Sequence, residues 1–524
     1  MISSLYLIRP RPDFPNPYSM EFFEELGYKP VVQSFDLSIT TVAAMVPDSM
    51  KVTLCDESLE PVDFETDADL IGITAIGTQF KRMLWIADEF RKRNKLVMIG
   101  GPFASLNPDL VRDHCDILVK GEIELIYQKL FSDLHQGKWE REYCGERPET
   151  IVNPIPRLDG YKNDRALGGN IQTSRSCPFE CEFCDVITFL GKGQRLKPVE
   201  DVIRELENLR AYGYNMATFA DDNITANRQN ARKLFTAIRD WNNEKCNGLF
   251  KFSAQLSIDF ADDQELLELL RDSNVIYAFV GIETPNEESL RESKKRHNLA
   301  GEIHERVRKC VENGIALSSG IMVGFDADRS DIFDKQYEFA MSLPIPIFII
   351  RAVVAPFQTP LYKRLREQNR IIETGTEFCE NIYETNIIPR NMSRETLAEG
   401  VKYLVNKLYT PDAFEHRIQL FLDTFKNGPL YIETNLRKYL NVKMRMIERD
   451  ANDILQNHFS SLGAGEAKLF QRLQKEYFSN MKFSMRGKAI LSGFLMAYMQ
   501  HRYLYKKQKI WKDTQNLTPE PVTA

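Results

Sequence analysis

The sequence predicts an α/β protein with three parts: a doubly wound, Rossmann-like sheet, a partial (β/α)6 TIM-like barrel and an all-helical region. The length of 524 residues is too great for a single hydrophobic core. Short apolar runs alternate with amphipathic stretches, as in parallel sheets covered by helices, and this pattern fades after about residue 362. We place the parts at residues 1–140, 166–365 and 366–524, with a linker at 141–165.

Five apolar runs define the predicted N-terminal sheet. They are SLYLIRP, KVTLCDE, ADLIGITAIG, KLVMIGGP and CDILVKGE. Between two of them, FKRMLWIADEFRKR has the apolar spacing of a helix, which indicates a parallel βαβ layout. The following ERPETIVNPIPRLDGYKND is rich in Pro and polar residues, so we predict an extended connector there.

Six further strands with helices between them predict the partial barrel. The strands are GGNIQTSRS, MATFADDN, FKFSAQLS, IYAFVGIET, IALSSGIMVGF and IPIFIIRAVVAPF. In barrels of this kind the chemistry lies at the C-terminal ends of the strands. Candidate functional residues are therefore sought in the loops that follow each strand.

Composition and charge exclude several classes of protein. The formal charge of -6 and pI near 5.9 provide no general field for a polyanion, so nucleic acid is not predicted as a partner. Nine cysteines, mostly isolated, are typical of a reducing compartment, and we predict a cytoplasmic location. No window offers the roughly 20 apolar residues that span a bilayer, and the first apolar run is too short for a signal peptide.

Three cysteines gather in TSRSCPFECEFCDVI, directly after the first barrel strand. Cys177, Cys181 and Cys184 form a C-x-x-x-C-x-x-C pattern, and Pro178 argues against a helix there. Three thiolates can hold an iron-sulfur cluster and leave one iron open for a reacting ligand. Zinc with Cys246 or His297 as a distant ligand, or simple burial, are the alternatives. No second paired-cysteine module is present, which favours the cluster.

The cysteine loop resembles the signature of the radical S-adenosylmethionine (SAM) superfamily. The resemblance implies that Cys177, Cys181 and Cys184 hold a 4Fe-4S cluster whose open iron chelates the amino and carboxylate groups of SAM. It implies that one electron, from a donor such as flavodoxin or ferredoxin, cleaves SAM to a 5'-deoxyadenosyl radical. That radical takes hydrogen from an unactivated carbon.

The same resemblance assigns SAM contacts to residues at successive strand ends. Acidic residues in FADDN replace the family's Gly-Gly-Glu motif, GIETPNEESL supplies a polar residue for ribose, and GIMVGF supplies glycines against adenine. A strand-end acid also serves as a helix cap, and glycines also serve turns, so these alternatives stay open. The predicted SAM residues are Phe183, Asp221, Asp222, Glu283, Gly320 and Gly324.

The order of the three parts resembles the cobalamin-binding class of this superfamily, which includes hopanoid C-methylases and tetrapyrrole-modifying enzymes. The resemblance implies a cobalamin-binding-type N-terminal domain, with Thr74, Gly100 and Gly101 near the cofactor. The Asp-x-His-x-x-Gly motif that supplies histidine to cobalt elsewhere is absent. Loss of cobalamin would leave the same absence, and Gly100-Gly101 also suits a strand-to-helix turn.

The predicted function is cobalamin-dependent C-methylation of a small-molecule or lipid substrate. Radical cyclisation, rearrangement and 3-amino-3-carboxypropyl transfer are alternatives, and a non-catalytic cobalamin or metal sensor is another. Beyond the cluster ligands, no catalytic acid or base is predicted.

The C-terminal region begins with a predicted capped helix at Ser393 and Glu395, and we expect the region to close the barrel mouth. Residues 486–512 combine an apolar stretch with basic and aromatic residues. This composition suits either contact with a membrane surface or a core helix with a solvated basic end.

Overall fold

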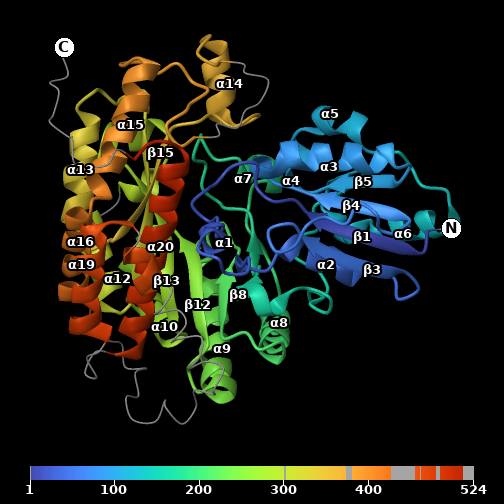
Figure 1. Cartoon of the computed structure of the whole chain (residues 1–524), viewed down its shortest axis with the longest axis horizontal. Helices are drawn as coiled ribbons and strands as arrows, with labels where there is room; N and C mark the ends of the chain where they lie inside the picture. Colours follow the sequence, from blue (N-terminus) through green and yellow to red (C-terminus); the bar gives the residue numbers. More distant parts are fainter. Residues whose placement is uncertain are drawn as a thin grey trace.

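Two parallel sheets lie side by side in the computed structural model, which describes residues 2–299, 302–372, 381–425, 455–460, 462–478 and 484–511. The N-terminal sheet lies on the right in Figure 1, and the half-barrel with most of the helices lies on the left. The protein therefore has the predicted α/β fold with a half-barrel parallel sheet. Within the described ranges, no helix has the length and apolarity required to cross a membrane.

The N-terminal sheet has six parallel strands in the order β3-β1-β4-β5-β6-β7. The five predicted strands are present. The sixth, β7, falls inside the range 141–165 given to the linker and ends just before the Pro-rich stretch that begins at Glu146, whose described residues form no strand. Pairing with β6 and burial of Tyr143 give β7 its place at the sheet edge. The strands are β1 (Ser4–Arg9), β3 (Lys51–Asp56), β4 (Leu70–Thr74), β5 (Leu96–Gly100), β6 (Ile117–Gly121) and β7 (Glu142–Gly145).

Helices cover both faces of this sheet, as the doubly wound prediction requires (Figure 1). Leu5 and Leu7 share one core with helices α2 (Leu37–Met45) and α6 (Tyr127–Gln136). Tyr6 and Ile8 alternate to the other face and share a core with α3 (Phe80–Lys92). Shorter helices α4 (Pro102–Leu106) and α5 (Pro108–Val111) accompany them, whereas α1 (Phe22–Glu25) lies beside the half-barrel, where Phe22 contacts Tyr503 of the C-terminal region (Figure 1).

The half-barrel has seven parallel strands in the order β15-β14-β13-β12-β11-β8-β2. Six are the predicted barrel strands. The seventh, β2 (Val32–Ser34), comes from the N-terminal part and is too short for sequence periodicity to reveal. The six are β8 (Ala166–Ile171), β11 (Met216–Phe219), β12 (Lys251–Leu256), β13 (Val275–Glu283), β14 (Ala316–Val323) and β15 (Ile347–Ala352).

The predicted connecting helices pack on the outer face of the half-barrel. They are α8 (Val199–Ala211), α9 (Arg228–Cys246), α10 (Gln264–Asp272), α12 (Ile303–Glu312) and α13 (Ile332–Ser342). Smaller elements lie within the loops at the carboxyl ends of the strands. These are the hairpin β9 (Ser174–Arg175) with β10 (Arg195–Leu196), and the helices α7 (Val186–Leu190), α11 (Glu287–Glu292) and α14 (Pro360–Glu367).

The described part of the C-terminal region is helical, as predicted, apart from one antiparallel bridge between Ile371 and Ile387. Ser393 caps α15 by accepting a hydrogen bond from the amide of Thr396, which confirms the predicted helix start. The main helices are α15 (Arg394–Leu408), α16 (Pro411–Thr424), α19 (Ala464–Leu473) and α20 (Met485–Lys507).

Helix α20 lies on the inner face of the half-barrel. Thr218, Ser253 and Tyr277 are register neighbours on adjacent strands, so their side chains share one face. Tyr277 Oη lies 3.1 Å from the carbonyl oxygen of Ala489 and donates to this turn of α20. The helix crosses in front of the sheet in Figure 1.

The burial of α20 decides between the two interpretations of residues 486–512. Its apolar side chains belong to the protein core, so within residues 486–511 this stretch is a core helix and offers no apolar face to a membrane. Lys512 lies outside the described residues. The fully buried side chains include Ile490, Leu491, Leu495, Tyr498 and Met499.

Gly493 allows α20 to approach the sheet, and its replacement tests this packing. A Cβ at this position would lie 1.9 Å from Tyr277 Oη. Helix propensity alone predicts that Gly493→Ala stabilises the protein by about 1 kcal/mol. We expect instead a net loss of about 1–3 kcal/mol from overpacking, seen as a lower Tm.

Tyr277→Phe provides the control for this prediction, because it removes the oxygen that the new methyl group would meet. Gly493→Ala should be less destabilising in the Tyr277→Phe background than in the wild type. Equal costs in the two backgrounds would contradict the proposed packing.

Candidate functional site at the cysteine loop

The predicted SAM and cluster residues of the barrel lie at one edge of the half-barrel sheet. The cysteine loop follows β8, Asp221 and Asp222 follow β11, and Glu283 ends β13. Because the strands are parallel, their carboxyl ends meet at this edge. Cys246 ends α9, which returns to the opposite edge before β12 begins, so it is no partner for the loop cysteines.

The three thiols of the loop lie near one another in a desolvated environment. Cys181 is buried, and Cys177 and Cys184 are half-buried. Burial raises the pKa of all three thiols, to about 12 for Cys184, and the charges of Cys177 and Cys181 contribute to that rise. Thiols in such a site need a metal or a cation to become thiolates.

Among the described residues, no three His, Cys, Asp or Glu side chains form a compact mononuclear metal site. The cysteines of a 4Fe-4S cube bind separate irons, so their sulfur atoms stand further apart than ligands of a single ion.

Asp221 lies beneath the start of the cysteine loop and is 2% exposed. Its carboxylate accepts hydrogen bonds from the Thr173 amide at 3.0 Å, the Thr173 hydroxyl at 2.7 Å and the Ser174 hydroxyl. Burial raises the pKa of Asp221, while these donors oppose that rise. With three donors already bound, Asp221 is suited to holding the loop, and its predicted contact with SAM stays a prediction.

Asp222 faces a large cavity beside the loop. One carboxylate oxygen accepts a hydrogen bond of 3.0 Å from the amide of Ser176, which has the left-handed φ of 74°. Burial raises the pKa of Asp222 to about 6, with further upward contributions from Asp221 and Asp185. The Asp222 carboxylate lines this cavity and is placed to meet a cationic ligand there.

Glu182, in the middle of the cysteine loop, forms an ion pair with Arg364 of α14. Its buried carboxylate lies 3.1 Å from Arg364 Nε and 2.5 Å from Arg364 Nη2. Arg364 also bonds Asp326 at 2.8 Å, and the Leu361 amide donates to the Glu182 carbonyl at 2.9 Å. This bidentate pair joins the loop after β8 to the loop after β15.

Glu283 forms a buried ion pair that sequence reasoning missed. Lys295 Nζ lies 2.6 Å from Glu283 Oε1 and 5.7 Å from the centre of the Phe183 ring. In the sequence Lys295 belongs to the charged run RESKKRHN, which reads as a solvated surface. No local signal distinguishes this buried lysine from its exposed neighbours.

Gly320 and Gly324 make room for protein groups in the described structure. A Cβ at Gly320 would lie 3.3 Å from Glu283 Oε2. Gly324 has φ 105°, and a Cβ there would lie 2.8 Å from Leu397 of α15. Asp328 accepts hydrogen bonds from the Gly324 and Phe325 amides, so Gly324 serves a turn. The predicted adenine contact of both glycines stays a prediction.

Buried arginines join the cysteine loop to the N-terminal sheet. Arg175, two residues before Cys177, pairs with Glu122 and Glu124, and Arg195 of β10 also pairs with Glu122. Burial alone would raise the pKa of Glu122, but hydrogen bonds from Arg195 and Arg175 hold it below its ordinary value. This network was not predicted, because its partners are far apart in the sequence.

Thr74, Gly100 and Gly101 line a mainly apolar cavity of about 330 Å³ at the carboxyl edge of the N-terminal sheet. Gly101 has φ 92°, and a Cβ there would lie 2.3 Å from Thr74 Oγ1. Asn153 Oδ1 is buried in the wall without a hydrogen-bond partner among the described residues. The other walls come from β-strands, α2 and α7 and include Leu7, Leu37, Val42, Gly72, Met98, Val119, Phe189 and Leu190.

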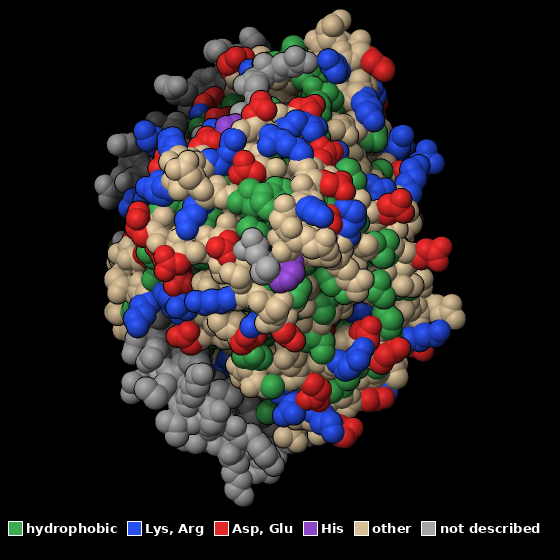
Figure 2. Space-filling view, turned by 90° about the vertical axis from the view of Figure 1, so that its right-hand side faces the viewer, with side chains coloured by type: hydrophobic (Ala, Val, Ile, Leu, Met, Phe, Trp, Pro, Cys, Tyr) green, Lys and Arg blue, Asp and Glu red, His purple; other side chains and the backbone are tan. Residues whose placement is uncertain are grey.

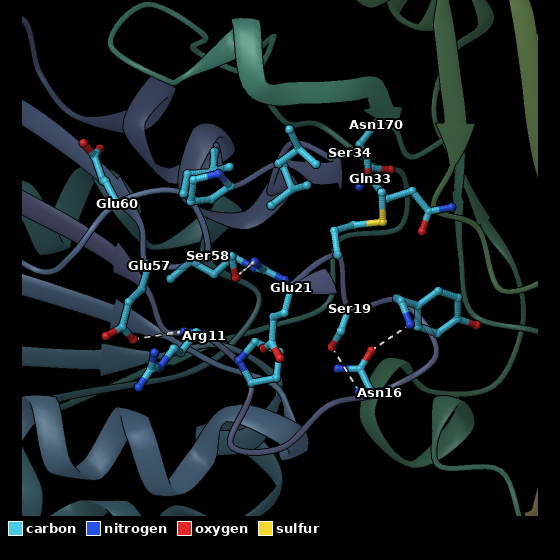
Figure 3. A pocket seen from close by; sticks show the side chains of 18 of the residues that line it. Arg11, Asn16, Ser19, Glu21, Gln33, Ser34, Glu57, Ser58, Glu60 and Asn170 are labelled. Atoms are coloured by element: carbon cyan, nitrogen blue, oxygen red, sulfur yellow. Dashed lines mark hydrogen bonds between the residues drawn. The ribbon is translucent and has the colours of Figure 1, made fainter. Parts of the chain in front are cut away.

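A second cavity of about 920 Å³ lies between the N-terminal sheet and the inner face of the half-barrel. Figure 3 shows Gln33, Ser34 and Asn170 on one side of it and Glu57, Ser58 and Glu60 on the other. Asn170 Oδ1 is buried here without a described partner. The polar lining residues include Asn170, Thr218, Asp222, Gln255 and, from α20, Tyr503.

The surface over the N-terminal sheet carries no field of a single sign. Figure 2 shows Lys and Arg side chains interspersed with Asp and Glu across this face.

Comparison with known families identifies two regions. Residues 171–334 match the radical SAM superfamily. Residues 359–460 match a domain of unknown function, DUF4070. The first match covers the cysteine loop, the Asp221-Asp222 pair and the Glu283 strand end.

Curated relatives extend the similarity beyond this region. The chain is 32% identical over 390 residues to an uncharacterized methyltransferase of Synechocystis sp., which covers 73% of this chain and 72% of that protein. It is 31% identical over 344 residues to the hopanoid C-2 methylase of Rhodopseudomonas palustris, covering 64% of each. The bacteriochlorophyllide d C-8(2)-methyltransferase of Chlorobaculum tepidum is 25% identical over 442 residues, 79% of this chain and 94% of that one.

Solved structures share the fold. The radical SAM methyltransferase TsrM of Kitasatospora setae, with cobalamin and a 4Fe-4S cluster bound, has a TM-score of 0.55 at 18% identity over 70% of this chain and 75% of its own. The cobalamin-dependent SAM radical enzyme OxsB, with aqua-cobalamin and SAM bound, has a TM-score of 0.59 at 14% identity, covering 97% and 80%.

Asp221 and Asp222 form a matched pair for testing how the loop is held. Asp221→Asn replaces an acceptor oxygen by an amide donor that faces donors, which should cost about 1–3 kcal/mol of unfolding free energy. We expect lower iron and sulfide content after anaerobic reconstitution. Asp222→Asn keeps an acceptor for the Ser176 amide and should retain the iron. If the two variants lose iron equally, the result argues against a specific role of Asp221 in holding the cysteine loop.

Proposed function

The chain belongs to the radical SAM superfamily, and on that premise we propose that it is a cobalamin-dependent C-methyltransferase acting on an unactivated carbon. The observation that carries the proposal is the similarity along most of the chain to relatives named as methyltransferases. Two of these are named for methylation of carbon in a hopanoid and in a bacteriochlorophyllide. No finding favours cyclisation, rearrangement, 3-amino-3-carboxypropyl transfer or a sensor.

Cys177, Cys181 and Cys184 are the residues that would hold the 4Fe-4S cluster. When bound, the cluster supplies the electron that cleaves SAM to a hydrogen-abstracting radical. Asp221 and Glu182 hold the loop in position, and Asp222 offers a carboxylate to the cationic part of SAM. We keep Phe183, Glu283, Gly320 and Gly324 as proposed SAM neighbours.

The cavity around Thr74, Gly100 and Gly101 suits the nucleotide tail of cobalamin. Its apolar walls match an aromatic base, and the buried Asn153 Oδ1, which has no hydrogen-bond partner among the described residues, provides an acceptor in the wall. The glycines at 72 and 101 keep the cavity free of side chains. When bound, cobalamin supplies the methyl group, and the N-terminal sheet is then the cobalamin-binding-type domain of the prediction.

The large cavity is the proposed chamber for the substrate and the reacting face of the cofactor. It reaches from the loops after β1 and β3 to Asp222 beside the cysteine loop. Its inner wall of Asn170, Thr218 and Gln255 can hydrogen-bond a substrate. This polar wall supports a small molecule with polar groups over a purely hydrocarbon lipid.

The protein contributes placement and exclusion of solvent. The ion pairs of Arg175 and Arg195 with Glu122 hold the cysteine loop against the N-terminal sheet, so both cofactor sites share one interface. Helix α20 closes the inner face of the half-barrel with buried side chains. Such a scaffold brings reacting atoms together and protects a radical from water.

Anaerobic turnover with methyl-labelled SAM tests the proposal. We expect label in the product, together with 5'-deoxyadenosine formed under reducing conditions. Cys184→Ala removes one cluster ligand, so it should abolish the labelled product, the 5'-deoxyadenosine and the bound iron. It should retain corrinoid binding. 5'-Deoxyadenosine without label in any product would favour one of the other radical outcomes.

Val42→Trp is the reciprocal variant, because Val42 of α2 lines the apolar cavity and an indole would fill it. We expect loss of corrinoid, measured by absorbance and extraction, with iron and sulfide retained. Val42→Ala, which enlarges the cavity, is the matched control and should keep both. Unchanged corrinoid binding in Val42→Trp would show that the cofactor does not bind in this cavity.

A further inference from the structure

A buried ammonium group lies beside the cysteine loop. Lys295 is 9% exposed, and its Nζ lies 2.6 Å from Glu283 Oε1. The same Nζ lies 5.7 Å from the centre of the Phe183 ring, and Phe183 stands between Cys181 and Cys184 in the loop. Lysine is almost never fully buried without a partner for its charge, so this placement requires an explanation.

The backbone around the pair is shaped to hold it. A Cβ at Gly281 would lie 2.3 Å from Glu283 Oε1 and 2.7 Å from Lys295 Nζ. Gly320 provides the space on the other side of the carboxylate. Glu283 itself adopts the left-handed φ of 68°, and its carbonyl accepts a hydrogen bond of 2.9 Å from Gln336. Strained backbone of this kind persists where the surroundings impose it, commonly at functional sites.

The turn that carries Lys295 is fastened to the cysteine loop and to β13. The Glu182 amide donates to the Ser293 carbonyl at 3.0 Å, and the His297 ring stacks on Phe179 with centres 4.0 Å apart. The side-chain Nδ2 of Asn298 donates to the carbonyls of Gly281 and Ile282, each at 2.9 Å. The ammonium is therefore held in one place relative to the thiols.

The charge of Lys295 lies beside the ligands of the proposed cluster, because the Phe183 ring that its Nζ faces belongs to a residue between Cys181 and Cys184 in the loop. A cluster on three thiolates carries net negative charge, which grows when the cluster accepts an electron. In a desolvated site a fixed positive charge stabilises that extra electron more than it would in water.

We propose that Lys295 is a charge-compensating and positioning residue of the cluster site, which raises the reduction potential of the cluster held by Cys177, Cys181 and Cys184. Glu283 moderates this effect because it pairs with the ammonium. The inference goes beyond methyl transfer but depends on the cluster of the proposed function.

Redox titration of the anaerobically reconstituted full-length protein, followed by electron paramagnetic resonance without SAM, tests the inference. We expect Lys295→Met to lower the ratio of reduced to oxidised cluster at a given potential about tenfold, which is about 59 mV for a one-electron couple. Glu283→Gln leaves the ammonium without its carboxylate and should shift the ratio in the opposite direction. Lys295→Arg keeps the charge and should stay close to the wild type.

Opposite shifts in Lys295→Met and Glu283→Gln are the signature of charge compensation. A role in folding alone would lower the iron content of both variants without opposite shifts, and that result overturns the inference. If Lys295→Met does not retain iron, the other two variants decide. Iron retained in Lys295→Arg, together with a higher reduction potential in Glu283→Gln, supports the inference. Loss of iron in Lys295→Arg overturns it. Wild-type protein without iron overturns the proposed function as well, whereas unchanged potentials in loaded variants overturn the inference alone.

Discussion

The placement of the cysteine loop depends on buried charged side chains. A loop of three cysteines has no regular hydrogen-bond ladder of its own, so its shape must come from contacts with neighbouring elements. Asp221 holds its start, the Glu182–Arg364 pair holds its middle, and Arg175 joins it to Glu122 and Glu124. Each carboxylate is buried and paired, which makes these contacts costly to break.

The same contacts bring two cavities to one interface. Glu122 follows β6 at the carboxyl edge of the N-terminal sheet, and Arg175 follows β8 at the carboxyl edge of the half-barrel. The smaller, mainly apolar cavity and the larger cavity of mixed lining both lie along this junction. The proposed cofactor site at one sheet and the cysteine loop at the other therefore share this junction.

The C-terminal helix α20 contributes to the site from the far end of the chain. It packs on the inner face of the half-barrel, where Tyr277 contacts its backbone and Tyr503 reaches the large cavity. The helix occupies part of the barrel interior and so limits the space available to a substrate. The expectation that the helical region as a whole closes the barrel mouth stays a prediction.

The sequence by itself determined the strand order along the chain, the half-barrel and the three cysteines, because apolar periodicity and close cysteine spacing are local properties. It did not reveal β2 and β7, which are short and take their place through pairing with distant strands. Only the tertiary structure decided that Lys295 is buried against Glu283, that Asp221 serves the loop, and that α20 is a core helix. These depend on contacts between residues far apart in the chain, and a charged run or an apolar helix has the same local pattern whether it meets solvent or another element.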